Sequence, residues 1–195
     1  MKYIEGLVSS EIKEKKSKFI GFLYPINSLD DIKLLIIDFK KKYSDAKHIV
    51  YAYSINQNFG SNDDKEPAGT AGKEIKNALI NWGVDDCILL VVRYFGGTLL
   101  GKGLLSRTYY KVADLTLEKA LFYVKEKKNK VKMRFTHEYT FDINYILHDE
   151  KILETTFEDK VTYECIVSDT TLNNLKIKSY IEILSSEEIL DNISL

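Results

Sequence analysis

The longest unbroken apolar run in the chain, Cys87–Val92, most constrains the fold. Its six residues fall far short of the roughly 18 to 20 needed to cross a bilayer. Because the run is short and rich in β-branched residues, it predicts a central strand rather than a helix. Four glycines follow within eleven residues of Val92 and predict a tight turn that leads into a helix; they are Gly96, Gly97, Gly101 and Gly103.

The segments around this strand alternate between strand and helix patterns. Ser28 provides an N-cap hydroxyl before apolar residues at helical spacing, which predicts a helix that ends near Tyr43. Further helices are predicted from about Gly72 to Trp82 and from about Gly103 to Tyr123. The remaining expected elements are a hairpin of 3–12 and 18–24, a half-buried strand at 48–57 and a polar loop at 59–72.

The rest of the chain reads as strand, helix, strand, strand, helix, strand, which is the split βαβ arrangement of a ferredoxin-like sandwich. The expected ranges are 132–140, 141–147, 151–157, 161–167, 170–178 and 180–184. A charged stretch, Lys125–Lys130, is interpreted as the connector. We therefore expect an α+β protein of two domains, residues 1–127 and 128–195.

Charge and cysteine usage narrow the class of protein. Residues 1–127 hold 20 Lys and Arg against 16 Asp and Glu, whereas residues 128–195 hold 8 against 13. Only the first part has a sign suited to polyanions, and its excess is modest. Cys87 and Cys165 are too few and too far apart for a disulfide framework or a four-ligand zinc site. With no apolar secretion signal in residues 1–10, we expect a cytoplasmic protein.

The glycine-rich turn comes within one residue of a phosphate-binding loop, because Gly96 is followed after four residues by Gly101 and Lys102. Gly103, however, stands where a hydroxyl would bind magnesium, and no later apolar strand ends in an Asp that could hold the metal. This argues against nucleotide hydrolysis. Two interpretations remain open, namely an anion site and a purely structural turn with close helix packing.

A loop places three carboxylates within four residues, Asp63, Asp64 and Glu66. They could bind a divalent cation or act as acid and base, but an Asx-turn in a solvated loop explains the same pattern and is favoured. The run 68–72 then brings a flexible backbone to a helix start, where Thr70 is the expected cap. We predict neither a metal site nor a cofactor.

Several cations lie at the margins of these segments beside aromatic residues. Single-stranded nucleic acid is held by base stacking on aromatic rings and by phosphate pairing with Arg or Lys. The candidate nucleic-acid or partner-binding residues are Lys47, His48, Arg93, Tyr94, Lys102 and Arg107, with Phe95 as a further stacking candidate. For most of the aromatic residues, packing in the core is the competing interpretation.

Four blocks of sequence, taken together and in order, resemble the YigZ/IMPACT family. They are Ser17–Gly21, Ala46–Tyr53, Asp63–Gly72, and Val91–Gly97 running on through Gly101, Gly103 and Arg107. The resemblance covers about residues 15 to 113. The tail is similar to the small ferredoxin-like domain attached in bacterial members.

The resemblance implies a first domain similar to domain 2 of a small-subunit ribosomal protein and to domain IV of elongation factor G, and a tail similar to domain V of that factor. It also implies a role in translation, because eukaryotic members oppose activation of a starvation-responsive kinase. No catalytic residues are carried over. The family pattern marks one shared surface, formed by His48, Asp63, Asp64, Glu66, Thr70, Arg93, Gly96, Gly97, Gly101 and Arg107. Lys65 and Leu104 depart from the pattern, which usually has glycine there.

These observations favour a non-enzymatic binding protein that contacts RNA, the ribosome or a translation-associated protein. One alternative is an enzyme that acts on a small phosphorylated or carboxylated substrate through Asp63, Asp64 and Glu66. Another alternative is an adaptor that binds only proteins.

Overall fold

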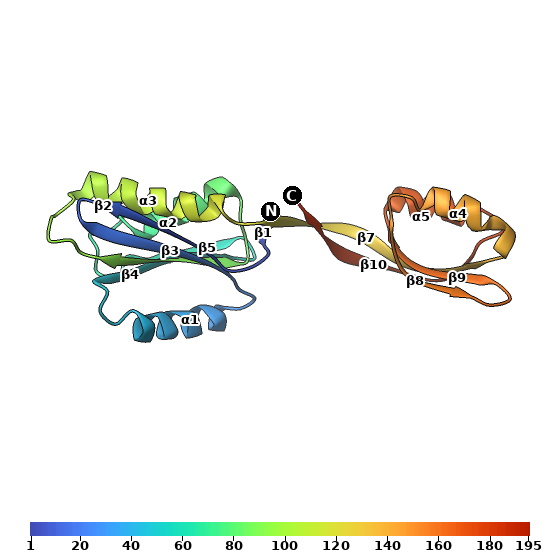
Figure 1. The fold of residues 1–195 in the computed structure, drawn as a ribbon, viewed down its shortest axis with the longest axis horizontal. Helices are drawn as coiled ribbons and strands as arrows, with labels where there is room; N and C mark the ends of the chain where they lie inside the picture. Colours follow the sequence, from blue (N-terminus) through green and yellow to red (C-terminus); the bar gives the residue numbers. More distant parts are fainter. The chain divides into compact units, whose positions relative to one another are not determined.

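The computed structural model describes all 195 residues, which form two compact units (Figure 1). The first unit comprises Met1–Val124 with Ser194–Leu195, and the second comprises Lys125–Ile193. Two five-stranded sheets and five α-helices make this a mixed α+β chain, which confirms the expected fold class. None of the helices is long and apolar enough to cross a membrane.

The apolar run forms the middle strand of the first sheet, as predicted. This strand, β6 (Cys87–Tyr94), lies antiparallel between β3 (Ser17–Pro25) and β4 (His48–Ile55). The outer strands are β2 (Val8–Glu14) and β5 (Asn58–Asn62), in the order β2-β3-β6-β4-β5. Residues 87–93 of β6 are all buried, so neither face of this strand meets solvent.

Helices cover both faces of this sheet, which explains why β6 is apolar at consecutive positions rather than at alternate ones (Figure 1). Leu89 and Val91 belong to the core that includes residues of α2 (Gly72–Trp82) and α3 (Lys102–Glu118). Leu90 and Val92 belong to the core beneath α1 (Leu29–Lys42). The side chains of β6 therefore alternate between two separate cores.

The other sheet comprises the short β1 (Tyr3–Ile4) and four strands that lie mostly in the second unit. These four are β7 (Phe122–Phe135), β8 (Lys151–Phe157), β9 (Val161–Val167) and β10 (Glu182–Ser194), and their pairing gives the order β10-β7-β9-β8. This order matches the expected ferredoxin-like sandwich. Between the strands lie η1 (His137–Tyr139), α4 (Thr140–Ile146) and α5 (Asp169–Lys176). In the first unit, β1 pairs with Phe122 and Tyr123 at the start of β7.

The chain ends are held in the first unit. Ser194 Oγ donates a hydrogen bond of 3.0 Å to Glu5 Oε1. The backbone N–H of Leu195 donates one of 2.9 Å to the carbonyl oxygen of Phe122. The first unit is therefore assembled from both ends of the described chain.

The stretch Lys125–Lys130 follows the boundary between the two units, close to the expected boundary at 127, but it is a strand rather than an irregular connector. It lies within β7, which pairs with β10, and β10 continues to Ser194 instead of ending at 184. The ion pair between Lys127 and Glu188, 2.8 Å long, joins the two strands. Lysine-rich sequence has low strand propensity, so the local pattern gave no sign of a strand that pairing with distant residues stabilises.

Three other boundaries also differ. The predicted strand at 3–12 is divided into β1 and β2, and α3 ends at Glu118 instead of 123. Residues 59–62, expected in a loop, belong to β5, which begins at Asn58. A two-residue turn joins β5 to β4, and its residues Asn56 and Gln57 both have positive φ. A type I′ hairpin turn requires that geometry, but it usually has glycine at its second position, so the sequence signal was weak.

Gly96 packs directly against the turn between β2 and β3. Its N–H donates to Ser17 Oγ at 3.1 Å, and an added Cβ would overlap the Lys16 carbonyl group. Gly103, in the first turn of α3, has open space, since only Arg107 Nη1 would lie within 4 Å of an added Cβ. The first glycine is required by packing and the second is not.

We expect Gly96→Ala to lower the free energy of unfolding by about 1 to 3 kcal/mol, because backbone atoms must move to admit the methyl group. Gly103→Ala serves as the matched control and should leave it unchanged or slightly raise it. Urea unfolding followed by circular dichroism measures both. Equal midpoints for Gly96→Ala and the parent would contradict the close approach.

Candidate functional site

An open cleft of about 470 Å³ lies in the first unit, between the start of β4, the end of β6 and the start of α3. Its polar lining residues are Lys47, His48, Glu66, Arg93, Gly101 and Lys102. Its apolar lining residues are Pro67, Phe95, Leu99, Leu100 and Leu105. The cleft thus combines cations with exposed apolar surface.

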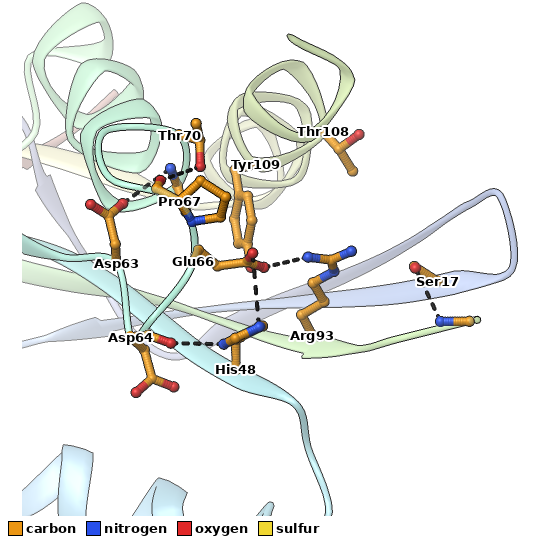
Figure 2. A network of polar contacts seen from close by, with 12 residues as sticks. Ser17, His48, Asp63, Asp64, Glu66, Pro67, Thr70, Arg93, Thr108 and Tyr109 are labelled. Atoms are coloured by element: carbon orange, nitrogen blue, oxygen red, sulfur yellow. Dashed lines mark hydrogen bonds and ion pairs between the residues drawn. The ribbon is translucent and has the colours of Figure 1, made fainter. Parts of the chain in front are cut away.

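A buried carboxylate at this cleft joins three segments that are distant in sequence. Glu66 Oε1 accepts a hydrogen bond of 2.5 Å from Arg93 Nη1 and one of 2.8 Å from the Tyr109 hydroxyl (Figure 2). The side chains of Glu66 and Arg93 are only 3% and 6% exposed. The loop after β5, the end of β6 and the middle of α3 are therefore fixed to one another at this point.

Tyr109 donates to Glu66 as a neutral phenol. Burial, reinforced by the adjacent Glu66 carboxylate, raises the pKa of Tyr109 well above its ordinary value. Arg93 is also in contact with aromatic rings, because its Cζ lies 5.3 Å from the ring centre of Phe19 and 5.8 Å from that of Phe95. Arg93 and Tyr109 therefore hold the buried carboxylate from two directions.

His48 lies between the loop backbone and the buried carboxylate. Its Nδ1 lies 2.7 Å from the carbonyl oxygen of Asp64 (Figure 2). Because a carbonyl oxygen only accepts, Nδ1 carries a proton and donates it. The other ring nitrogen, Nε2, lies 3.8 Å from Glu66 Oε2. His48 therefore connects the loop to the carboxylate at the edge of the cleft.

The other two carboxylates of the loop stabilise the backbone. Asp63 accepts hydrogen bonds of 2.8 to 3.1 Å from the N–H groups of Gly69, Ala71 and Gly72 and thereby caps α2. Asp64 Oδ2 accepts one of 2.7 Å from the N–H of Ile49. These donors are six or more residues away in sequence, so neither Asp63 nor Asp64 forms an Asx-turn. The Asx-turn of this loop is made by Asn62, whose Oδ1 accepts a hydrogen bond of 2.8 Å from the N–H of Asp64.

Lys65 is one of the two departures from the family pattern, and the loop conformation shows how a lysine is accommodated there. Its φ is +66°, in the left-handed region that favours glycine, and Asp64 before it has a φ of +41°. The loop keeps this conformation with a lysine because neighbouring residues anchor it on both sides. Asp64 is bound to β4, and Glu66 is bound to β6 and α3.

Most of the predicted site residues gather in or beside the cleft, and some do not. Lys47, His48, Glu66, Arg93, Gly101 and Lys102 line it. Arg107 is exposed on α3 and is not part of the lining. Thr70 is not the cap of α2 that was predicted, because its hydroxyl donates to the carbonyl oxygen of Pro67 and the N-cap position is Ala71. Gly96 and Gly97 form the turn after β6, where Gly97 has a φ of +82°.

Tyr94 does not belong to this site, because successive side chains of β6 point to opposite faces. It packs with the core beneath α1, and its hydroxyl donates to Asp45 at 3.2 Å. Phe95, which follows the strand, lines the cleft and is 43% exposed. Of the two stacking candidates, only Phe95 is available to a ligand there.

Sequence reasoning missed Pro67, Leu99, Leu100 and Leu105 in the lining and missed Tyr109 as the partner of Glu66. Leu99, which is 84% exposed inside a glycine-rich loop, carried a usable signal because a large apolar residue there has no expected packing role. Tyr109 carried none, since its spacing in α3 is that of any core residue.

We expect Glu66→Ala to lower the free energy of unfolding by about 3 to 5 kcal/mol, because it leaves the Arg93 guanidinium buried without a counter-charge. Tyr109→Phe removes a single hydrogen bond and should cost about 1 kcal/mol. Urea unfolding at neutral pH ranks the two variants. A smaller loss for Glu66→Ala than for Tyr109→Phe would contradict the central place given to the ion pair.

The raised pKa of Tyr109 also predicts alkaline sensitivity. The unfolded chain releases the phenolic proton near pH ~10, whereas the folded chain retains it. Stability from this group is therefore complete below pH ~10 and is lost as the pH rises further. In urea unfolding between about pH 8 and about pH 11, the parent should lose more stability than Tyr109→Phe. Parallel profiles would contradict this assignment.

Comparisons with known proteins agree with this architecture. Residues 15–117 match the Impact N-terminal domain. IMPACT family member YigZ of Escherichia coli is 38% identical over 100 residues, which span about half of each protein, 49% in both cases. IMPACT family member YvyE of Bacillus subtilis is 32% identical over 170 residues, covering 84% of this chain and 77% of that protein.

A solved structure described as the crystal structure of a hypothetical protein is 25% identical and superposes with a TM-score of 0.62. The match covers 94% of this chain and 96% of that one. The family-specific segment includes every residue that lines the cleft. The chain therefore belongs to the YigZ/IMPACT family.

Proposed function

We propose that this chain is a translation-associated binding protein that contacts RNA through the cleft of its first unit. The observation that carries the proposal is the exposed ring of Phe95 beside the exposed lysines Lys47 and Lys102 in one cleft. An RNA base stacks on such a ring while lysines pair with the neighbouring phosphates. The protein acts in the cytoplasm.

The distribution of charge supports this assignment. Residues 1–127 hold 20 Lys and Arg against 16 Asp and Glu, while residues 128–195 are acidic overall. The first unit is therefore the part that attracts a polyanion. Family membership supports the association with translation, because the resemblance to eukaryotic members implies that role.

The state of the loop carboxylates favours binding over catalysis. Asp63 and Asp64 are hydrogen-bonded to backbone N–H groups, and Glu66 is paired with Arg93 and Tyr109. A carboxylate that binds a metal needs an oxygen directed at the ion, and one that acts as a general base needs an oxygen directed at the substrate. An enzyme that uses these three residues is consequently the less supported function.

The test separates the electrostatic contribution from the stacking contribution. The first measurement is the binding of a short single-stranded RNA at several salt concentrations. In the double variant Lys47→Ala with Lys102→Ala, the negative slope of log affinity against log salt should become shallower by about 1.4, the effect of losing two phosphate contacts. Phe95→Ala should weaken binding about tenfold with an unchanged salt slope, because stacking is not ionic. Fluorescence anisotropy measures both quantities.

Lys111→Ala is the control, since Lys111 is exposed on α3 but does not line the cleft. Its affinity and its salt slope should equal those of the parent. RNA binding that survives both the double lysine variant and Phe95→Ala would overturn the proposal. Ribosome sedimentation at two salt concentrations, with the same variants, then tests the association with translation.

A further inference from the structure

The strand β8 lies at one edge of the sheet in the second unit. Its strand neighbour is β9, and the order β10-β7-β9-β8 places no strand beyond it. All seven of its residues are exposed. In an antiparallel edge strand, alternate residues direct their N–H and carbonyl groups away from the neighbouring strand. The outer side of β8 therefore offers a row of backbone hydrogen-bonding groups to a further strand.

The register of β8 shows which side chains a further strand would cover. Ile152 lies opposite Cys165 and Phe157 lies opposite Val161, and both of these β9 residues belong to the core beneath the helices of this unit. Opposed residues of an antiparallel pair point to the same face of the sheet. Ile152 and Phe157 thus point to the helix side, yet they are 42% and 62% exposed because the edge is uncovered.

The other edge strands expose less apolar surface. Large apolar side chains are exposed at three of the seven positions of β8, namely Ile152, Leu153 and Phe157. The edge strands of the first sheet, β2 and β5, expose none, and β10 exposes two among thirteen residues. Proteins usually protect edge strands with charges or with a cover, because an exposed apolar edge associates with other strands. The composition of β8 therefore favours a strand that acquires a partner.

Charge selects between the possible occupants of this edge. Residues 149–160, which comprise β8 and its flanking loops, hold five Asp and Glu against two Lys. A second copy of the chain would bring the same acidic segment against itself, which is unfavourable because like charges on paired strands repel. A basic segment of another protein has the complementary sign.

The two faces of β8 also specify the pattern of that segment. Glu154 lies opposite Glu164, which stands between two core residues of β9 and therefore on the face away from the helices. The register shift between Ile152 and Glu154 leaves Glu154–Phe157 as the regular stretch, so the added strand is short. Successive residues of a strand alternate between faces. The fitting segment therefore alternates apolar residues, which cover Ile152 and Phe157, with lysine or arginine, which lie near Glu154.

We infer that the outer edge of β8 binds a short, basic and extended segment of a partner protein as an additional strand. Backbone hydrogen bonds supply the attachment, and the alternating side chains supply the specificity. The inference goes beyond the proposed function, because it concerns a protein partner and the second unit rather than RNA and the first unit.

The test mixes the full chain with a labelled synthetic peptide that alternates valine with lysine, and it measures binding by fluorescence anisotropy. Two matched peptides accompany it, one with glutamate in place of lysine and one with methylated backbone nitrogens. The lysine peptide should bind saturably. The glutamate peptide should bind much more weakly because of its charge, and the methylated peptide because it lacks the N–H donors that strand pairing requires.

Variants of the protein locate the binding. Phe157→Thr should weaken binding of the lysine peptide about fivefold, the effect of losing one apolar cross-strand pair. Leu190→Thr is the matched control, since it removes a side chain of β10 that is 64% exposed, and it should leave the affinity unchanged. Nitrogen–proton correlation spectra of the parent should show peptide-dependent shifts in the amides of residues 154–157.

Equal affinity for the lysine and methylated peptides, or for the lysine and glutamate peptides, would overturn the inference. An absence of saturable binding, or equal affinity in Phe157→Thr and the parent, would also overturn it. Dimerisation of the parent in analytical ultracentrifugation, abolished by Phe157→Thr, would assign the edge to a second copy instead. The double variant Lys47→Ala with Lys102→Ala should bind the peptide as the parent does, and a loss there would place the peptide in the cleft and overturn the inference.

Discussion

The buried ion pair of Glu66 with Arg93, completed by the Tyr109 hydroxyl, is the interaction on which the rest of the first unit depends. Either charge alone would be strongly unfavourable in the interior, so the two are stable only when the loop, β6 and α3 meet in one arrangement. The same arrangement brings the start of α3 to the cleft and places His48, across the sheet register from Arg93, beside the carboxylate. The geometry of the cleft therefore follows from the need to pair the buried charges of Glu66 and Arg93.

Where the fold followed from local sequence, a strong periodic signal was present. Six consecutive apolar residues required a strand covered on both faces, and Ser28 with Asp31 forms the capping box that starts α1. Only parts of β7 and β10 were predicted, within the expected strands 132–140 and 180–184. Their remaining residues, 122–131 and 185–194, are mostly polar, and pairing between strands about sixty residues apart stabilises them. A window of local sequence does not contain the partner that makes such a strand stable.

The site was predictable to the extent that its residues are charged and lie next to glycine-rich turns. Lys47, His48, Arg93 and Lys102 were found in this way. Their roles were not, since only the fold shows that Arg93 is committed to Glu66 while Lys102 is exposed. Alternation along β6 already implies that Arg93 and Tyr94 point to opposite faces, so grouping both in one site was an error of reasoning from sequence. Only the fold shows which of the two faces carries the cleft. Apolar lining residues such as Leu100 are indistinguishable in sequence from core residues.

The hydrogen bond from Ser194 to Glu5 has a topological consequence. The chain leaves the first unit after Val124 and re-enters it at Ser194, so the ferredoxin-like unit has the connectivity of a domain inserted into a host domain. The second unit is therefore joined to the first by two covalent connections, one after Val124 and one before Ser194. A truncation within the second unit would also remove Ser194, and with it a hydrogen bond of the first unit.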